Sequence, residues 1–254
     1  MTLPRTPSFR LGGRRALITG GTRGIGLGAA VALAEAGAAV TIAARTAADV
    51  EAVVNELARA GLGAEGVALD ITDVDAARAF IDEVDPFQIL VNSAGTARHS
   101  GFAGITPENY QAVMDLNLSA TLFVSQAVVA RLIAAGLAGS IIHISSQMGH
   151  VGGPDRALYA ASKFAVEGLS KAMAIELGAH NIRVNTICPT FIETEMTAKS
   201  LSDPSFRSWV LSKIKLGRLG RIEDIMGPIV FLASDAAALV TGASLMVDGG
   251  WTAE

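Results

Sequence analysis

The chain alternates short runs rich in β-branched residues with longer alanine-rich segments, and this alternation restricts its fold more than any other feature. The runs have the length of strands, whereas the segments between them have the period of helices. Such alternation is typical of βαβ units, in which helices connect parallel strands. The candidate strands span residues 16–20, 39–44, 65–70, 88–95, 140–146, 182–188 and 244–250. We therefore expect an α/β fold with a seven-stranded parallel sheet flanked by helices.

Helix boundary signals support this division of the chain. The segment that follows the first strand ends at Gly37, a residue type that commonly terminates helices. Residues 106–136 begin with Thr106 as a helix cap and Pro107 at the first helical position, followed by acidic Glu108. A third long helix is expected over residues 159–180.

Length and composition favour one domain. A chain of 254 residues, half of them hydrophobic, can bury one large core. It has no repeat and no linker rich in proline or serine, so residues 1–254 are interpreted as a single domain. Residues 1–12 are expected to form a loose leader. They lack the apolar stretch of a secretory signal, which favours a cytoplasmic location, with organelle import as the alternative because the leader contains arginines. We expect no membrane association.

Charge and cysteine content exclude several classes of function. The net charge is -4, and the Lys and Arg residues are dispersed, so no nucleic-acid partner is expected. Cys188 is the sole cysteine, which rules out an intrachain disulfide and favours a reducing compartment. Cys188 and the four scattered histidines show no metal-ligand spacing, so the sequence predicts no metal site. His143 and Cys188 are interpreted as core residues.

A glycine-rich turn, TGGTRGIG at residues 19–26, connects the first strand to the first helix. Gly20, Gly24 and Gly26 would let the backbone approach a pyrophosphate closely, and free N–H groups at the start of the helix would bind its charge. The alternative is a turn that serves only tight packing. The motif predicts a dinucleotide site in a Rossmann-like, doubly wound fold.

The end of the second strand bears on the choice of cofactor. A site selective for NAD places an acidic residue there, against the ribose 2′-hydroxyl. This chain has Ala44 and Arg45 instead. Arg45 and Arg23 could clamp a 2′-phosphate, because guanidinium groups suit bidentate phosphate contacts. We expect NADP(H), with NAD(H) as the alternative if Arg45 is a solvated loop residue.

Tyr159 and Lys163, in the segment YAASK, would lie one turn apart on the same helix face. An ammonium group beside a phenol favours the phenolate, so the pair could act as a tuned proton donor and acceptor. Ser146 ends the fifth strand, at the sheet edge where ligands bind in open α/β folds. The alternative is a surface Tyr and Lys at helical spacing.

Taken together, these motifs resemble those of the short-chain dehydrogenase/reductase family over nearly the whole chain. NSAG at 92–95 is similar to the Asn-Asn-Ala-Gly motif of that family, and YAASK is similar to its Tyr-x-x-x-Lys motif. Ser146 stands at the family's spacing before Tyr159, and Asn117 matches its catalytic asparagine. Thr190 departs from the family, which usually has glycine after the proline. The resemblance implies that the catalytic residues are Asn117, Ser146, Tyr159 and Lys163.

The resemblance also implies roles for these residues. Tyr159 would exchange a proton with the substrate oxygen, and Ser146 would hydrogen-bond that oxygen. Lys163 would lower the pKa of Tyr159 and hold the nicotinamide ribose, while Asn117 would anchor a water that relays protons. The cofactor-binding residues would be Gly20, Thr22, Arg23, Gly24, Ile25, Gly26, Arg45, Asp70, Ile71, Asn92, Ala94, Gly95, Tyr159, Lys163, Pro189, Ile192 and Thr194.

Residues 194–218 are expected to form a helical lid over the substrate. Polar residues in the loops after the fourth and fifth strands, including Asp155 and Arg156, suggest a hydroxylated or acidic substrate, although each alone is better explained as a solvated residue. The candidate substrate contacts are Ser146, Gln147, His150, Tyr159, Met196 and Trp209.

The sequence thus predicts an oxidoreductase that transfers hydride between NADP(H) and a carbonyl or secondary alcohol. The substrate would be a small molecule such as a polyol, a sugar acid or a 3-oxoacyl compound. An NAD-dependent alcohol or polyol dehydrogenase of the same fold and a catalytically silent regulatory protein that binds the cofactor are the alternatives. Family members commonly pair the helices at 106–136 and 157–180 between subunits, so a homotetramer is expected.

Overall fold

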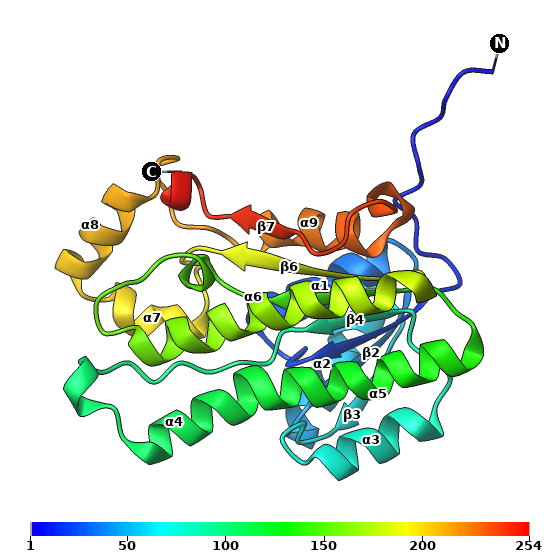
Figure 1. Cartoon of the computed structure of the whole chain (residues 1–254), viewed down its shortest axis with the longest axis horizontal. Helices are drawn as coiled ribbons and strands as arrows, with labels where there is room; N and C mark the ends of the chain where they lie inside the picture. Colours follow the sequence, from blue (N-terminus) through cyan, green and yellow to red (C-terminus); the bar gives the residue numbers. More distant parts are fainter. Residues whose placement is uncertain (1, 254) are drawn as a thin grey trace.

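The computed structural model describes residues 2–253, which form one seven-stranded parallel sheet covered by helices on both faces (Figure 1). The strand order is β3-β2-β1-β4-β5-β6-β7. The chain therefore starts near the middle of the sheet, builds outward to β3, and then returns to β4 beside β1. The strands are β1 (Arg15–Thr19), β2 (Ala39–Ala44), β3 (Ala64–Ala68), β4 (Ile89–Asn92), β5 (Gly139–Ile144), β6 (Ile182–Pro189) and β7 (Ser244–Val247).

All seven strands expected from the sequence are present, but several end earlier than predicted. The fourth was expected over residues 88–95 and ends at Asn92. It stops there because the Thr19 hydroxyl accepts the N–H groups of Ser93 and Ala94, at 3.2 and 3.4 Å, where a ladder partner would otherwise stand. The seventh strand ends at Val247 because Gly249 adopts a positive φ of 61° and turns the chain.

Two layers of helices pack on the sheet. The helices are α1 (Gly24–Glu35), α2 (Ala47–Arg59), α3 (Val74–Glu83), α4 (Pro107–Met114), α5 (Ala120–Ala135), α6 (Ala157–Leu177), α7 (Glu195–Leu201), α8 (Pro204–Lys213) and α9 (Glu223–Ala233). One core cluster joins the sheet to α1, α2 and α9 through residues such as Leu33 and Ile229. A second cluster joins the opposite face to α3, α5 and α6 through residues such as Ile81 and Val128.

The helix predicted over residues 106–136 is interrupted. A π-helical turn, η2 (Asp115–Ser119), separates α4 from α5. Thr106 caps α4 as predicted, since its hydroxyl accepts the N–H of Asn109 at 3.2 Å. The combined segment Pro107–Ala135 is long and apolar enough to cross a membrane by composition, yet Val124 and Val128 lie in the protein core. A π-helical turn such as η2 contains one residue more than a regular helical turn. Such turns often mark functional sites, because they redirect one side chain of an otherwise regular helix.

The segment expected as a lid contains the short helices α7 and α8, which lie beside the C-terminal end of the chain (Figure 1). Aromatic rings hold this region together. Phe191 stacks on Trp251 with ring centroids 5.8 Å apart, and Trp209 contacts Trp251 edge-on at 5.5 Å. These contacts anchor the lid helices over the carboxyl ends of the strands.

Candidate active site

The turn between β1 and α1 forms a cradle made of backbone. Gly20 and Gly24 adopt positive φ angles of 67° and 54°, which glycine tolerates best. A Cβ added to Gly26 would lie 2.1 Å from the Gly20 carbonyl oxygen, so this close approach requires glycine. No side chain among the described residues caps the start of α1, and its N–H groups are free to bind an anion. The turn, which also contains Thr22 and Ile25, therefore fits a pyrophosphate.

Charged residues surround this cradle. Arg45 is exposed at the end of β2. Arg23 is exposed in the glycine turn and lies 3.4 Å from Glu195 in a solvated ion pair. Asp70 follows β3, and its pKa is lowered by hydrogen bonds from Thr72 and, to a smaller extent, by Arg45. Two exposed guanidinium groups at this rim are suited to a phosphate on the ribose.

Asn92, one of the expected cofactor residues, has its side chain inside the protein. Its side chain is buried, and its amide nitrogen lies 2.9 Å from the Ser125 hydroxyl and 3.1 Å from Nδ1 of His143. Asn92 thus connects β4, α5 and β5 inside the protein. The small residues of the NSAG motif pack against the glycine turn, since a Cβ on Gly20 would lie 2.8 Å from the Ala94 Cα.

Asn117 lies in the π-helical turn, and hydrogen bonds fix both polar atoms of its side chain. Its Oδ1 accepts the N–H of Thr96 at 2.8 Å, and its Nδ2 donates to the Thr96 carbonyl at 2.9 Å and to the Ser162 hydroxyl at 3.0 Å. A Cβ on Gly95 would contact both Asn117 Oδ1, at 3.3 Å, and Lys163 Nζ, at 3.9 Å. The π-helical turn therefore brings Asn117 to the same place as Lys163.

Ser146, Tyr159 and Lys163 converge at the carboxyl end of β5. Ser146 begins the short 3-10 turn η3 (Gln147–Gly149), and its hydroxyl accepts the Met148 N–H at 3.1 Å. Tyr159 and Lys163 lie in the first turns of α6, with Lys163 Nζ 5.7 Å from the Tyr159 ring centroid. Lys163 Nζ donates to the Ile144 carbonyl at 2.8 Å, which fixes the ammonium group at the base of the site.

Burial sets the direction of the pKa shifts of Lys163 and Tyr159. Burial lowers the pKa of Lys163 to about 8, against smaller opposing effects of Cys188 and Glu167. Burial raises the pKa of Tyr159, while the Ser146 hydroxyl and the Arg156 guanidinium partly offset this rise. The net shift is upward because loss of water around the phenol dominates, and the expectation that Lys163 lowers the pKa of Tyr159 stays a prediction. The phenol keeps its proton at neutral pH.

Two adjoining hollows form the candidate substrate pocket beside Tyr159. The expected residues Ser146, Gln147, Tyr159 and Met196 line the first hollow, and Trp209 lines the second. His150 was also expected here, but it lines neither hollow. Its ring turns toward Cys188 and Glu167 instead. His99, Arg156 and Ser200 are shared by both hollows and were not among the predicted substrate contacts.

Arg156 is the most informative residue of the pocket. It is only 8% exposed, although its loop position suggested a solvated side chain. The guanidinium carbon lies over the rings of Phe206 and Phe191, at 5.5 and 5.9 Å from their centroids. Within residues 2–253, no carboxylate forms an ion pair with it. Arg156 is the N-cap residue of α6, and its position three residues before Tyr159 is a sequence signal that could have placed it near the phenol.

The loop after β6 closes the site from the other side. The chain leaves the sheet at Pro189, and Ile192 then forms a bridge to Gly220. Thr194 lies next to the glycine turn, because a Cβ on Gly24 would be 3.5 Å from its Cγ2 atom. Thr190 lines the first hollow, and its buried hydroxyl has no hydrogen-bond partner in the described chain. A polar atom left unpaired beside a cavity is suited to a bound molecule.

The fold and the site together define a class of protein, the doubly wound dinucleotide-binding oxidoreductases. Three known proteins show how far the similarity extends. D-erythrulose reductase of Gallus gallus is 44% identical over 245 residues, covering 96% of this chain and 98% of the relative. L-xylulose reductase of Bos taurus is 40% identical over 245 residues, covering 96% of this chain and 99% of the relative.

The third is gluconate 5-dehydrogenase of Burkholderia cenocepacia, whose crystal structure contains NADP and tartrate. It superimposes on this chain with a TM-score of 0.94 at 38% sequence identity. The match covers 97% of this chain and 98% of that protein. The model of the family described as enoyl-(acyl carrier protein) reductase matches residues 20–252. This chain belongs to the short-chain dehydrogenase/reductase family.

Proposed function

We propose that this protein is an NADP(H)-dependent oxidoreductase that interconverts a small polyhydroxylated ketone and the corresponding secondary alcohol. The observation that carries the proposal is a pocket lined by Ser146 and Tyr159, with Lys163 next to the Tyr159 ring, at the same edge of the sheet as the glycine cradle. This juxtaposition supports proton transfer next to a bound dinucleotide.

When bound in the cradle, the nicotinamide cofactor supplies or accepts the hydride. Tyr159 donates its phenolic proton to the substrate oxygen during reduction and takes it back during oxidation. Ser146 donates a hydrogen bond to the same oxygen and stabilises its developing negative charge. The raised pKa of Tyr159 keeps the phenol protonated at neutral pH, which favours reduction in that range.

Lys163 and Asn117 support the proton transfer. Lys163 is held by the Ile144 carbonyl and carries a proton close to the Tyr159 ring. Its pKa of about 8 lies near neutral pH, so Lys163 can release and regain a proton during the reaction. Asn117 is fixed against Thr96 and Ser162, and its backbone in the π-helical turn is suited to hold a water between Lys163 and solvent.

The cofactor choice rests on the rim of the cradle. Arg45 and Arg23 are exposed, and no acidic residue ends β2. Both features favour the 2′-phosphate of NADP(H) over the free hydroxyl of NAD(H). The gluconate 5-dehydrogenase of Burkholderia cenocepacia was crystallised with NADP, and so was a similar structure described as a putative 2-deoxy-D-gluconate 3-dehydrogenase.

The pocket favours a small substrate with several hydroxyl groups. Gln147, His99 and Ser200 provide hydrogen-bonding groups on its walls. Arg156 adds a buried positive charge that forms no ion pair among the described residues, although the Asp155 carboxylate is near enough to favour its charged form. Such a guanidinium group suits a substrate carboxylate. The relatives named for D-erythrulose and L-xylulose reduction and for gluconate oxidation use substrates of this kind. We therefore propose ketoses and keto-sugar acids as the substrate class, with the acids bound through Arg156.

A substrate panel tests this proposal. Purified protein is mixed with NADPH or NADH and with ketoses, keto-sugar acids, simple ketones and 3-oxoacyl thioesters, and cofactor consumption is followed by absorbance. We expect turnover with NADPH on the first two groups, and much weaker turnover with NADH. Exclusive use of 3-oxoacyl thioesters, or no turnover with either cofactor, would reject the proposed function.

We further propose a homotetramer in the cytoplasm. Helices α4, α5 and α6 lie along one side of the molecule (Figure 1) and expose large apolar side chains there. Phe164 and Ile175 on α6 are 49% and 84% exposed, and Phe123 on α5 is 39% exposed. Large exposed apolar patches mark protein interaction surfaces, so we propose that this area is buried between subunits. Sedimentation of a monomer at micromolar concentration would contradict this assembly.

A further inference from the structure

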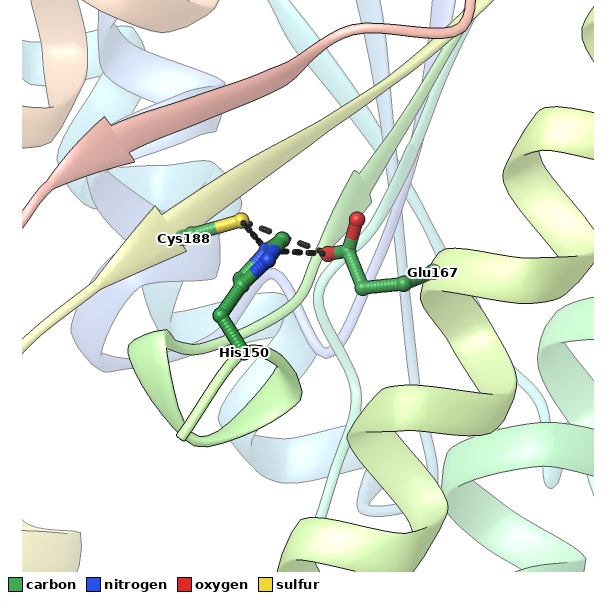
Figure 2. A group of neighbouring side chains, drawn as sticks. All are labelled: His150, Glu167 and Cys188. Carbon is green, nitrogen blue, oxygen red and sulfur yellow. Dashed lines mark hydrogen bonds and ion pairs between the residues drawn. The ribbon is translucent and has the colours of Figure 1, made fainter. Parts of the chain in front are cut away.

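Three side chains that are distant in the sequence meet beneath the active-site loop. His150 follows η3, Glu167 lies on α6 one turn beyond Lys163, and Cys188 lies near the end of β6 (Figure 2). Cys188 Sγ is 3.5 Å from His150 Nε2 and 3.3 Å from Glu167 Oε1, and the His150 and Glu167 atoms are 3.6 Å apart. One nitrogen, one oxygen and one sulfur atom thus form a nearly equilateral triangle.

The size of this triangle matches one face of a zinc tetrahedron. Zinc binds sulfur at about 2.3 Å and nitrogen or oxygen at about 2.0–2.2 Å. At tetrahedral angles a pair that includes sulfur is therefore separated by about 3.5–3.7 Å and a nitrogen–oxygen pair by about 3.3–3.5 Å. The three separations in the cluster lie within about 0.2 Å of these values, so only small shifts are needed to bind the ion. A mixed set of imidazole, thiolate and carboxylate is also the chemistry that zinc prefers, whereas magnesium and calcium select oxygen ligands alone.

Neighbouring hydroxyl groups position the carboxylate of Glu167 as a ligand. Its Oε2 accepts hydrogen bonds from Ser244 at 2.6 Å and Thr186 at 3.1 Å, and Lys171 lies 3.8 Å from the same oxygen. These partners occupy Oε2 and leave Oε1 directed at His150 and Cys188. Partners of this kind orient the ligands of protein metal sites.

A fourth polar group points to the same place. Ser145 is 3% exposed, and its hydroxyl forms no hydrogen bond of good geometry among the described residues. It lies near enough to Glu167 and Cys188 for weak hydrogen bonding to lower the pKa of both. A buried hydroxyl with such incomplete hydrogen bonding gains from a further partner, such as a bound cation.

We propose that His150, Glu167 and Cys188 bind one divalent cation of the zinc class, with the fourth position taken by water or by the Ser145 hydroxyl. The carboxylate and the thiolate balance the charge of the cation. Because the thiolate is the form that binds metals, binding releases the Cys188 proton to solvent. The cation would tie the loop after β5 to α6 and β6. Its role is therefore structural, and it takes no part in hydride transfer.

This inference revises the sequence-based expectation of no metal. Cys188 lies 38 residues from His150 and 21 from Glu167, separations that match no ligand motif. The ligands come together only because β5 and β6 are neighbours and α6 packs across them.

Metal binding by the whole protein tests the site. Protein stripped with a chelator is dialysed against micromolar Zn²⁺, and bound metal per chain is measured by mass spectrometry. We expect one zinc per chain in the wild type, and loss of stoichiometric binding in His150→Ala and Cys188→Ser. Ser244→Ala, which removes only a supporting hydrogen bond, should weaken zinc affinity by about 10- to 100-fold. With Co²⁺, a thiolate-to-cobalt absorption band should appear in the wild type and be absent in Cys188→Ser.

Two controls make the test decisive. His180→Ala removes an exposed histidine outside the cluster and should keep one zinc per chain. The side chain of His150 is 29% exposed, so His150→Ala leaves no core cavity and remains informative even if Cys188→Ser fails to fold. A wild type that binds no stoichiometric zinc, or a His150→Ala variant that binds it as well as the wild type, would overturn the proposal.

Discussion

The two halves of the sheet differ in which groups form their binding surfaces. Around β1, β2 and β3 the binding surface is made of backbone, because Gly20, Gly24 and Gly26 leave the N–H groups of α1 uncovered. Around β4, β5 and β6 it is made of buried polar side chains, with Lys163 6% exposed and Asn117 1% exposed. The glycine turn of the first half should therefore lose cofactor binding when a side chain is added. The second half should lose activity when a side chain is removed.

The largest expected effect comes from the polar half. Tyr159→Phe removes only the phenolic oxygen and keeps the ring beside Lys163. Loss of a general acid typically slows a reaction by about 10²- to 10⁴-fold, and we expect kcat to fall by this amount. Steady-state assays with NADPH measure the loss, and a fluorescence titration should show unchanged NADPH affinity. Retention of wild-type kcat would remove Tyr159 from the mechanism.

The next largest effect comes from the glycine half. A Cβ in Gly26→Ala would lie 2.1 Å from the Gly20 carbonyl oxygen, so the turn must open. We expect NADPH affinity to fall by about 100-fold, equivalent to about 2.7 kcal/mol. Gly227→Ala on α9 is the matched control, since a Cβ there meets no atom within 4 Å. Equal NADPH affinity in both variants would show that the close approach is not needed.

A smaller effect should separate acidic from neutral substrates. Arg156→Ala removes the buried guanidinium, and a hydrogen bond to a charged group contributes about 1.5–3 kcal/mol. We therefore expect kcat/KM to fall by about 10- to 100-fold for a keto-sugar acid and much less for a neutral ketose. Because Arg156 also contacts Phe191 and Phe206, a melting curve controls for loss of packing. Equal losses for both substrates would mean that Arg156 does not bind the carboxylate.

The exposed rim should show a still weaker effect. Arg45→Ala leaves Arg23 in place, and solvated charges contribute less than buried ones. We expect NADPH affinity to fall by about 10-fold while NADH affinity stays constant. Arg59→Ala, an exposed arginine at the far end of α2, serves as the control. Parallel changes for the two cofactors would place Arg45 outside the phosphate site.

The smallest effect is a pH dependence. The pKa of Lys163 is lowered to about 8, so its ammonium is present at neutral pH and is lost as the pH rises. Because reduction consumes a proton, kcat/KM for reduction should fall to about half near pH 8 and decline further above it. A pH–rate profile of the wild type measures this. A profile that stays flat to pH 10 would show that Lys163 does not take part in the proton transfer.

Features of the fold and of the site that depend on local sequence could be predicted. The strands were predictable because parallel strands buried on both faces are continuous apolar runs, as in ILVN at 89–92. The glycine turn and the Tyr159–Lys163 pair were predictable because their geometry is local. The π-helical turn at Asn117, the inward orientation of Asn92 and the burial of Arg156 depend on contacts with other elements, so no local pattern specifies them.

The cluster of His150, Glu167 and Cys188 depends most strongly on contacts between elements that are distant in the sequence. Its members lie in a loop, a helix and a strand, and they meet only when β5 and β6 pair. The fold therefore brings together residues whose spacing in the sequence does not predict a site.

The central claim is that the two halves contribute independently, and a double-mutant cycle on Arg45→Ala and Tyr159→Phe tests it most directly. Arg45 follows β2 and Ser146 follows β5, so three strand spacings of about 4.8 Å separate the two regions. Measured as kcat/KM with NADPH, the two losses should add in free energy within about 0.5 kcal/mol. A coupling energy well above 1 kcal/mol would contradict the account, because cofactor binding and proton transfer would then depend on one shared structure.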